Sequence, residues 1–174
     1  MPRHQRAFTL TELAVTLLIV ALASAMAYPA MGDAIAARRA RLAADALADD
    51  LASARRSAIA RGGGVAVCPS PDARRCAPGA PWHHGWLVVH GTVILAAHDA
   101  LPARLASSAR GGRDHMRFDE AGASLGDNTT VTLCVRKRPA TAESVVLSAA
   151  GKVRRETAGA ADAAACAAGH GAVR

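Results

Sequence analysis

Aromatic side chains are scarce in this 174-residue chain, which is 51% hydrophobic but only 3% aromatic. Much of the apolar content is alanine, so a core built from this sequence buries little apolar surface per residue. The length suits one domain with an N-terminal extension. We therefore expect a small domain whose apolar core is thin.

Motifs for metal binding and catalysis are also missing. The sequence has no second close pair of cysteines and no H-x₃₋₅-H pattern, so nothing supports a zinc site. His83 and His84 follow Trp82 in a Pro/Gly-rich stretch, and no Ser, Asp or Glu at a recognisable spacing completes a catalytic set with them. No phosphate-binding glycine loop is present. The sequence predicts no enzyme, no cofactor and no metal site, and it predicts exposed loop positions for the two histidines.

The four cysteines favour disulfides. An even number of cysteines in a small exported domain is typical of a disulfide framework, and four cysteines allow three pairings. Sequence proximity favours Cys68–Cys76, which leaves Cys134–Cys166 as the second bond. Each bond would contribute about 2–4 kcal/mol, which matters in an alanine-rich domain.

The N-terminus has a short basic segment, residues 1–7, followed by an apolar stretch, residues 8–31. As a helix this stretch would extend roughly 36 Å, which exceeds the bilayer core of about 30 Å. An ordinary secretory signal has a shorter apolar region followed by a small-residue cleavage site, so a membrane anchor fits better. Glu12 argues for more than an anchor, because a carboxylate near the start of a spanning helix is costly and by default marks function.

Glu12 would need a cation as its partner in the membrane. The α-amino group of Phe8 is such a cation only if the preceding residues are removed. The pair would then form one helical turn apart within a subunit, or between neighbouring subunits of an assembly.

The sequence RAFTLTEL at residues 6–13 resembles the type IV prepilin signature, in which a basic leader is cut before a Phe. The resemblance implies cleavage between Ala7 and Phe8 by prepilin peptidase, N-methylation of Phe8, and a role for Glu12 in docking into the filament. Ala7 stands where the family usually has Gly. Pro29 falls where many pilins carry a helix-kinking proline, consistent with the loss of one helical hydrogen bond.

Residues 32–61 continue the helix with an amphipathic pattern. Leu47, Leu51, Ala54 and Ala58 follow a 4-3-4 spacing, which predicts one apolar stripe with charged residues on the opposite side. The glycines at positions 62–64 end this helix.

Short apolar runs predict a β-rich domain over residues 62–157. The expected strands are residues 65–68, 86–89, 92–95, 116–118, 129–136, 144–148 and 152–155. Tight turns join the second strand to the third and the sixth to the seventh, which predicts two hairpins. Residues 158–174 are rich in alanine and glycine, and we expect a loose tail that a disulfide at Cys166 would hold.

This C-terminal half resembles the GspH/FimT family of minor pseudopilins. The shared motifs are Val67–Ser70, Cys76, Trp82, Gly85-Trp86, Phe118 with Gly122, residues 132–134 and residues 146–151. The resemblance implies an α+β, pilin-like fold, with a long N-terminal helix that spans the membrane in its first half and a small, mostly antiparallel β-domain. It also implies a minor pilin or pseudopilin of a type II secretion system or type IV pilus. Such a subunit assembles into a filament, at its initiation or tip, for protein secretion or pilus biogenesis.

The same resemblance implies the partners and the location of the chain. The partners would be other pilins or pseudopilins, prepilin peptidase, an inner-membrane assembly platform and the lipid bilayer. The chain would cross the bacterial inner membrane once, with its C-terminal domain in the periplasm, and would then enter a periplasmic or surface filament. The positive-inside rule, which places the flank richer in Lys and Arg in the cytoplasm, does not support this orientation. The three arginines after the apolar stretch, Arg38, Arg39 and Arg41, outnumber the two before it, Arg3 and Arg6.

Two basic clusters suggest an alternative function, a DNA-binding minor pilin for DNA uptake in natural transformation. The clusters are Lys152, Arg154 and Arg155, and Arg136, Lys137 and Arg138. If they formed one face, it would hold DNA phosphates through salt-sensitive contacts without sequence preference. Some FimT-like minor pilins carry a similar Gly-Arg-x-Arg motif linked to DNA uptake, although this chain has Lys in place of the first Arg. The competing interpretation is a solvated edge strand protected by its charges.

Overall fold

The structure is a computed structural model that describes residues 9–111, 115–124, 126 and 128–169; for residues 26–30 and 33 it describes the backbone alone. The chain divides into two compact units, Met1–Ile35 and Ala36–Arg174. One helix, α1 (Leu10–Arg61), contributes residues to both units.

Helix α1 forms because alanine, the strongest helix former, recurs throughout its second half. The predicted stripe from Leu47 to Ala58 is fully buried, which confirms the amphipathic pattern. The helix ends where Gly62 adopts a φ of +76° and the Gly63 N–H donates to the Ala58 carbonyl over 2.8 Å. These are the features of a glycine C-cap.

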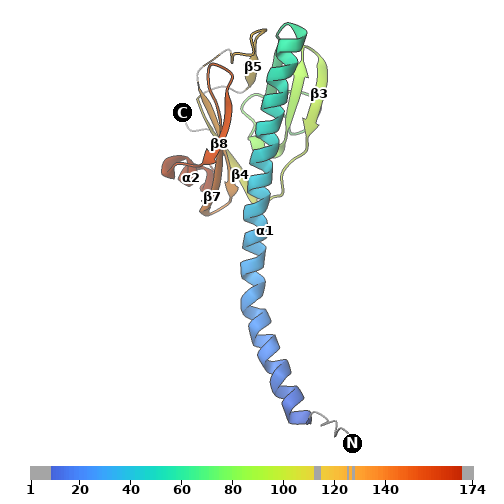
Figure 1. Ribbon diagram of the computed structural model, residues 1–174, viewed down its shortest axis with the longest axis vertical. Helices are drawn as coiled ribbons and strands as arrows, with labels where there is room; N and C mark the ends of the chain where they lie inside the picture. The colour runs from blue at the N-terminus through green and yellow to red at the C-terminus, as the bar shows by residue number, and fades with distance from the viewer. Residues whose placement is uncertain (1–8, 112–114, 125, 127, 170–174) are drawn as a thin grey trace, which may run out of the picture. The chain divides into compact units, whose positions relative to one another are not determined.

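The unit from Ala36 onward holds two four-stranded antiparallel sheets, in the part of the chain that the structure describes (Figure 1). Sheet A has the strand order β3-β2-β1-β5, and sheet B has the order β4-β6-β7-β8. The strands of sheet A are β1 (Val65–Pro69), β2 (Trp86–His90), β3 (Val93–His98) and β5 (Met116–Phe118). The strands of sheet B are β4 (Leu105–Arg110), β6 (Thr129–Val135), β7 (Arg138–Leu147) and β8 (Val153–Thr157).

The buried face of α1 packs against both sheets and closes one core with residues from β1, β2, β5, β6 and β7. Trp86 is fully buried there, and Trp82, in the short 3₁₀ helix η1 (Trp82–His84), is nearly so. The Trp86 indole N–H donates to the Asp50 carboxylate over 2.8 Å, and its ring stacks on His98 with centroids 4.0 Å apart. Both tryptophans therefore pack in the core.

Strand β4 was absent from the sequence prediction. Its sequence, LASSAR, contains small and polar residues in place of the β-branched and aromatic side chains that mark strands. It forms because it pairs with β6 along its whole length, and its first four residues are buried.

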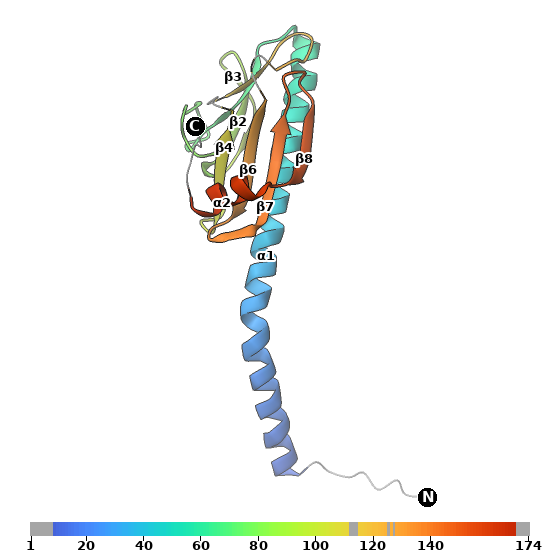
Figure 2. The same cartoon turned by 90° about the vertical axis from the view of Figure 1, so that its left-hand side faces the viewer.

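The C-terminal segment contains a helix, α2 (Ala160–Ala167), so the expectation of a loose tail is wrong for these residues. Figure 2 shows α2 against the face of sheet B turned away from α1. Ala163 and Cys166 pack there against Cys134 and its neighbours. An eight-residue helix is unstable alone in water, so packing on the sheet is what stabilises it.

Both predicted disulfides are present. The Cys134–Cys166 bond fastens α2 to β6, and the Cys68–Cys76 bond closes the loop that follows β1. Neither cysteine pair is left free to bind a metal.

The turn between β7 and β8 lies against the loop after β5. A Cβ added at Gly151 would collide with the Gly122 carbonyl oxygen, and Gly151 has a φ of +74°. The Arg55 Nε also donates to that carbonyl, over 2.9 Å, and the Ser124 N–H donates to the Ala149 carbonyl over 2.9 Å. The glycine that begins the basic motif therefore has a packing role.

We expect Gly151→Ala to destabilise the domain more than Gly79→Ala does. Both glycines have positive φ, +74° and +80°, but no atom lies within 4 Å of a Cβ placed at Gly79. The backbone strain of about 1–2 kcal/mol is thus common to both variants, and the collision at Gly151 adds about 1–3 kcal/mol. Urea unfolding of residues 36–174 measures both changes, and equal losses of stability would contradict the close approach.

Candidate functional site

The first half of α1 presents apolar side chains that nothing in its own unit covers. Every residue from Thr9 to Ala25 is exposed. The large apolar residues of this segment are between 55% and 85% exposed: Leu10, Leu13, Val15, Leu17, Leu18, Ile19, Val20 and Leu22. A contiguous apolar surface of this kind marks contact with a membrane or with other proteins. We call residues 10–25 the exposed apolar segment.

Glu12 lies in the first turn of α1, at the start of the exposed apolar segment. Thr9 precedes the helix, and its hydroxyl oxygen accepts from the Glu12 N–H over 3.3 Å. Thr9 and Glu12 thus have the sequence spacing of a capping box. In that motif the Glu side chain, three residues after the cap, accepts a hydrogen bond from the backbone N–H of the cap residue. Capping is a structural role for Glu12 that competes with docking. Ala7 and Phe8 lie outside the described residues.

A prediction about the helix just beyond this segment, a kink at Pro29, stays untested, and the expected membrane span is not found in the described part of the chain. Helix α1 continues through Pro29, whose side chain is not among those described, so a kink at this proline remains a prediction. Across the described residues, no helix is both long enough and apolar enough to cross a membrane.

The two basic clusters lie at opposite ends of β7. Arg138 begins β7 and pairs with Val135, whereas Arg154 on β8 pairs with Val146. Eight residues of β7 separate these positions (146 − 138), which is roughly 26 Å at 3.3 Å per residue. A whole strand lies between the two turns that carry the clusters, and whether the six residues act as one basic face stays a prediction.

Several of these arginines already have partners. The Arg155 Nε lies 2.7 Å from the Asp45 carboxylate of α1, and the Arg154 Nε lies 3.1 Å from the Glu156 carboxylate. The two arginines therefore point to opposite faces of sheet B, and each meets an acidic residue. Ion pairs of this kind reduce the positive charge offered to phosphates, so a DNA role for either cluster alone remains a prediction.

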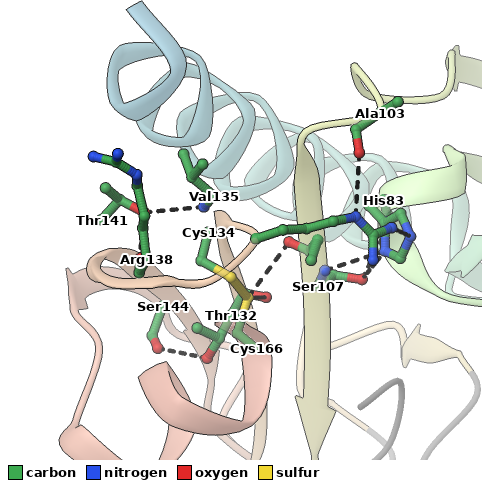
Figure 3. Close-up of a disulfide and its surroundings, with 12 residues drawn as sticks. His83, Ala103, Ser107, Thr132, Cys134, Val135, Arg138, Thr141, Ser144 and Cys166 are labelled. Atoms are coloured by element: carbon green, nitrogen blue, oxygen red, sulfur yellow. Dashed lines mark hydrogen bonds between the residues drawn. A yellow bond between two sulfur atoms is a disulfide. The ribbon is translucent and has the colours of Figure 1, made fainter. Parts of the chain in front are cut away.

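His83 is buried, contrary to the expectation of an exposed loop position, whereas His84 is exposed as expected. The Nδ1 of His83 lies 2.9 Å from the Ser107 hydroxyl on β4 (Figure 3). The guanidinium of Arg136 lies 3.2 Å from the Nε2 of His83. Arg136 also donates to the Ala103 carbonyl over 3.1 Å. These contacts connect η1, β4 and the β6–β7 turn.

The contact with Arg136 requires a neutral His83. A guanidinium group has only donors, and the Ser107 N–H also donates to Nδ1 over 3.1 Å, so both ring nitrogens face donors and neither site favours a second proton. Burial, followed by the charges of His84 and Arg136, lowers the pKa of His83 to about 4. Sequence reasoning could not find this role, because the partners of His83, Ser107 and Arg136, are distant from it in the chain.

Comparisons with known proteins agree with this architecture. A family model described as "Type II transport protein GspH" matches residues 43–151, and a model of the prokaryotic N-terminal methylation motif matches residues 2–28. None of the curated proteins matches the chain.

Two crystal structures of the type IV minor pilin FimU of Pseudomonas aeruginosa strain PAO1 share the fold, each at 19% sequence identity. The P65 crystal form has a TM-score of 0.55 and covers 67% of this chain and 91% of FimU. The P21 form has a TM-score of 0.54 and covers 70% and 89%.

A long N-terminal helix with a methylation motif, followed by two antiparallel sheets, defines a pilin-like filament subunit. More than half of the chain matches the GspH model, and the chain belongs to this family of type II transport proteins. It is a minor pilin or pseudopilin of a type II secretion system or a type IV pilus.

The buried His83 predicts an acid-sensitive stability. Its folded pKa of about 4 lies below the ordinary value of 6.5, so between these values the unfolded chain binds a proton that the folded domain does not. The stability contribution is therefore complete above pH 6.5 and is lost as the pH falls toward 4, by at most about 3 kcal/mol. Acid destabilises the domain because, as the pH falls, the unfolded state binds the proton before the folded state does.

We expect His83→Gln to lose less stability than the natural sequence between pH 7 and pH 4.5. Gln keeps an acceptor for Arg136 but does not titrate. His84→Gln is the comparison variant, because His84 is exposed and its charge lowers the pKa of His83 less than burial does; it should keep most of the natural pH dependence. Urea unfolding of residues 36–174 across this range is the measurement, and identical slopes in all three proteins would contradict the role of His83.

Proposed function

We propose that this chain is inserted once into the bacterial inner membrane, cut before Phe8, and assembled at the initiation point or tip of a filament. The observation that carries the proposal is the exposed apolar segment of α1, which coincides with the methylation motif. An apolar helix of this kind is stable only in lipid or against other apolar helices. The same segment would therefore serve first as an anchor and then as a filament contact.

The disulfides support a periplasmic location for the domain. Both bonds lie in the unit that follows Ile35. Disulfides persist in oxidising compartments, such as the bacterial periplasm, and are rare in the cytosol. An N-terminus in the cytoplasm and a domain in the periplasm are consistent with both the membrane anchor and the disulfides.

The fold likeness to a type IV minor pilin supports a minor position in the filament. The prepilin peptidase and an inner-membrane assembly platform are then the partners that would process and incorporate the chain. A deletion strain assayed in parallel for exoprotein secretion, twitching and DNA uptake would identify the machine it serves.

We expect the mature chain to begin at N-methylated Phe8. Removal of residues 1–7 frees an α-amino group beside the start of α1, where it supplies a cation close to Glu12. Intact-mass and N-terminal peptide analysis of membrane-extracted protein measures the processed terminus. A mature chain that retains Met1 would contradict the proposal.

Two substitutions at Glu12 separate docking from helix capping. An intramembrane carboxylate costs about 2.5–3.5 kcal/mol to insert, so both Glu12→Ala and Glu12→Gln should still enter the membrane. Gln retains the capping-box side chain but removes the charge. If the charge is what docks, both variants should lose crosslinking to other pilins.

Membrane fractionation and chemical crosslinking in cells measure the two outcomes. If only Glu12→Ala lost crosslinking, Glu12 would act as a helix cap. Full crosslinking in both variants would remove Glu12 from the docking contact altogether.

A further inference from the structure

Sheets A and B have four edge strands in the described part of the chain, namely β3, β5, β4 and β8. An open edge presents unpaired backbone N–H and C=O groups to other chains, and natural proteins protect such edges by short length, charge or cover. The four edges differ in how well they are protected.

Three of the edges carry such protection. Strand β5 has only three residues, and β8 contains Arg154, Arg155 and Glu156. Strand β4 is covered by η1, whose His83 N–H donates to the Ser107 hydroxyl over 3.1 Å. These edges offer little room for a partner strand.

Strand β3 lacks all three kinds of protection. Its first five residues, VILAA, include no charge and no proline, and Val93 and Ile94 are 57% and 43% exposed. Ala96 and Ala97 are exposed as well. In Figure 1, β3 lies at the border of the domain, with no ribbon beyond it. The pairing of β3 with β2 shifts register at Val88/Val89, where Leu95 of β3 falls between the paired residues.

The outer face of sheet A continues the apolar surface inward from β3. Ile94 pairs with Val89, Val89 with Ala66, and Ala66 with Arg117, so these four residues form one row across the four strands. Ala66, Val89 and Arg117 line a shallow hollow of about 440 Å³ beside the Cys76 loop. A strand added at β3 would extend this row by one side chain next to Ile94.

We propose that β3 pairs with an extended segment of another subunit of the filament, an inference that rests on the proposed function. Backbone hydrogen bonds to the open edge would supply affinity, and alternate side chains would pack beside Ile94 and Val93. The segment should be uncharged and rich in β-branched residues, because β3 offers no charge to match. A second copy of this chain fits less well, since the chain without Arg3 and Arg6 still carries a net charge of +5 (7 − 2), which makes two copies repel.

The test uses the full chain in its own cells with a photo-crosslinking benzoylphenylalanine in place of Ala96. Illumination should join it to another filament subunit, and the adduct should map to an extended, uncharged segment. Ile94→Lys should lower the adduct yield about tenfold, the change that corresponds to 1.4 kcal/mol of binding. Ile59→Lys is the matched control, because Ile59 is 51% exposed but lies on α1; its yield should stay within about twofold.

A second probe in place of Leu17, in the exposed apolar segment, separates the two levels of the proposal. If the Leu17 probe joins filament subunits and the Ala96 probe joins none, the β3 inference is overturned and the proposed function stands. If neither probe forms adducts, the proposed function fails. An adduct between two copies of this chain, or a yield that Ile94→Lys leaves unchanged, also overturns pairing of β3 with another subunit.

Discussion

One face of α1, packed against both sheets at once, holds the domain together. Leu47 and Leu51 are fully buried on this face, and the remaining contacts of the face are mostly alanines. Small side chains let the sheet backbones approach the helix closely, but each buries little apolar surface. The helix therefore organises the core without supplying most of its apolar area.

The few large side chains and the covalent bonds make up for the thin helix face. Trp86 and Phe118 are fully buried, and residues of this size bury about 150–250 Å² each. Asp50 accepts from Trp86, while Arg41 contacts Glu143 over 3.1 Å, so α1 also makes polar contacts with each sheet. The two disulfides restrict the unfolded chain and hold α2 and the loop after β1 in place.

The side chains of α1 differ in burial between the two units. From Ala36 onward it has a buried face, whereas Thr9–Ala25 is exposed throughout. The domain can thus be complete in water while the exposed apolar segment still requires a cover. This division fits the proposed function, in which lipid and then other subunits would cover the segment.

Periodicity predicted the parts of the fold that rest on local pattern. The apolar stripe of α1 and the β2–β3 hairpin follow from spacing and turn residues, and both are confirmed. Strand β4 and helix α2 depend on tertiary contacts that small residues do not reveal in sequence. The burial of His83 also required the fold, because Ser107 and Arg136 are distant from it in the chain.

For the candidate sites, the sequence predicted the disulfide pairs but not the arrangement of charges. The sequence left open whether the two basic clusters adjoin, and the length of β7 separates Arg138 from Arg154. Residue spacing cannot reveal such a separation until the strand boundaries are known. The free edge of β3 was likewise invisible, since it depends on the order of strands in sheet A.

The central claim is that the exposed apolar segment becomes buried in a filament. Quantitative mass spectrometry of filaments sheared from cells and purified tests it directly. Peptides of this chain should co-purify with the filaments, beginning at Phe8 and in smaller amounts than the principal subunit. A chain found only in the membrane fraction, with none in the filaments, would contradict it.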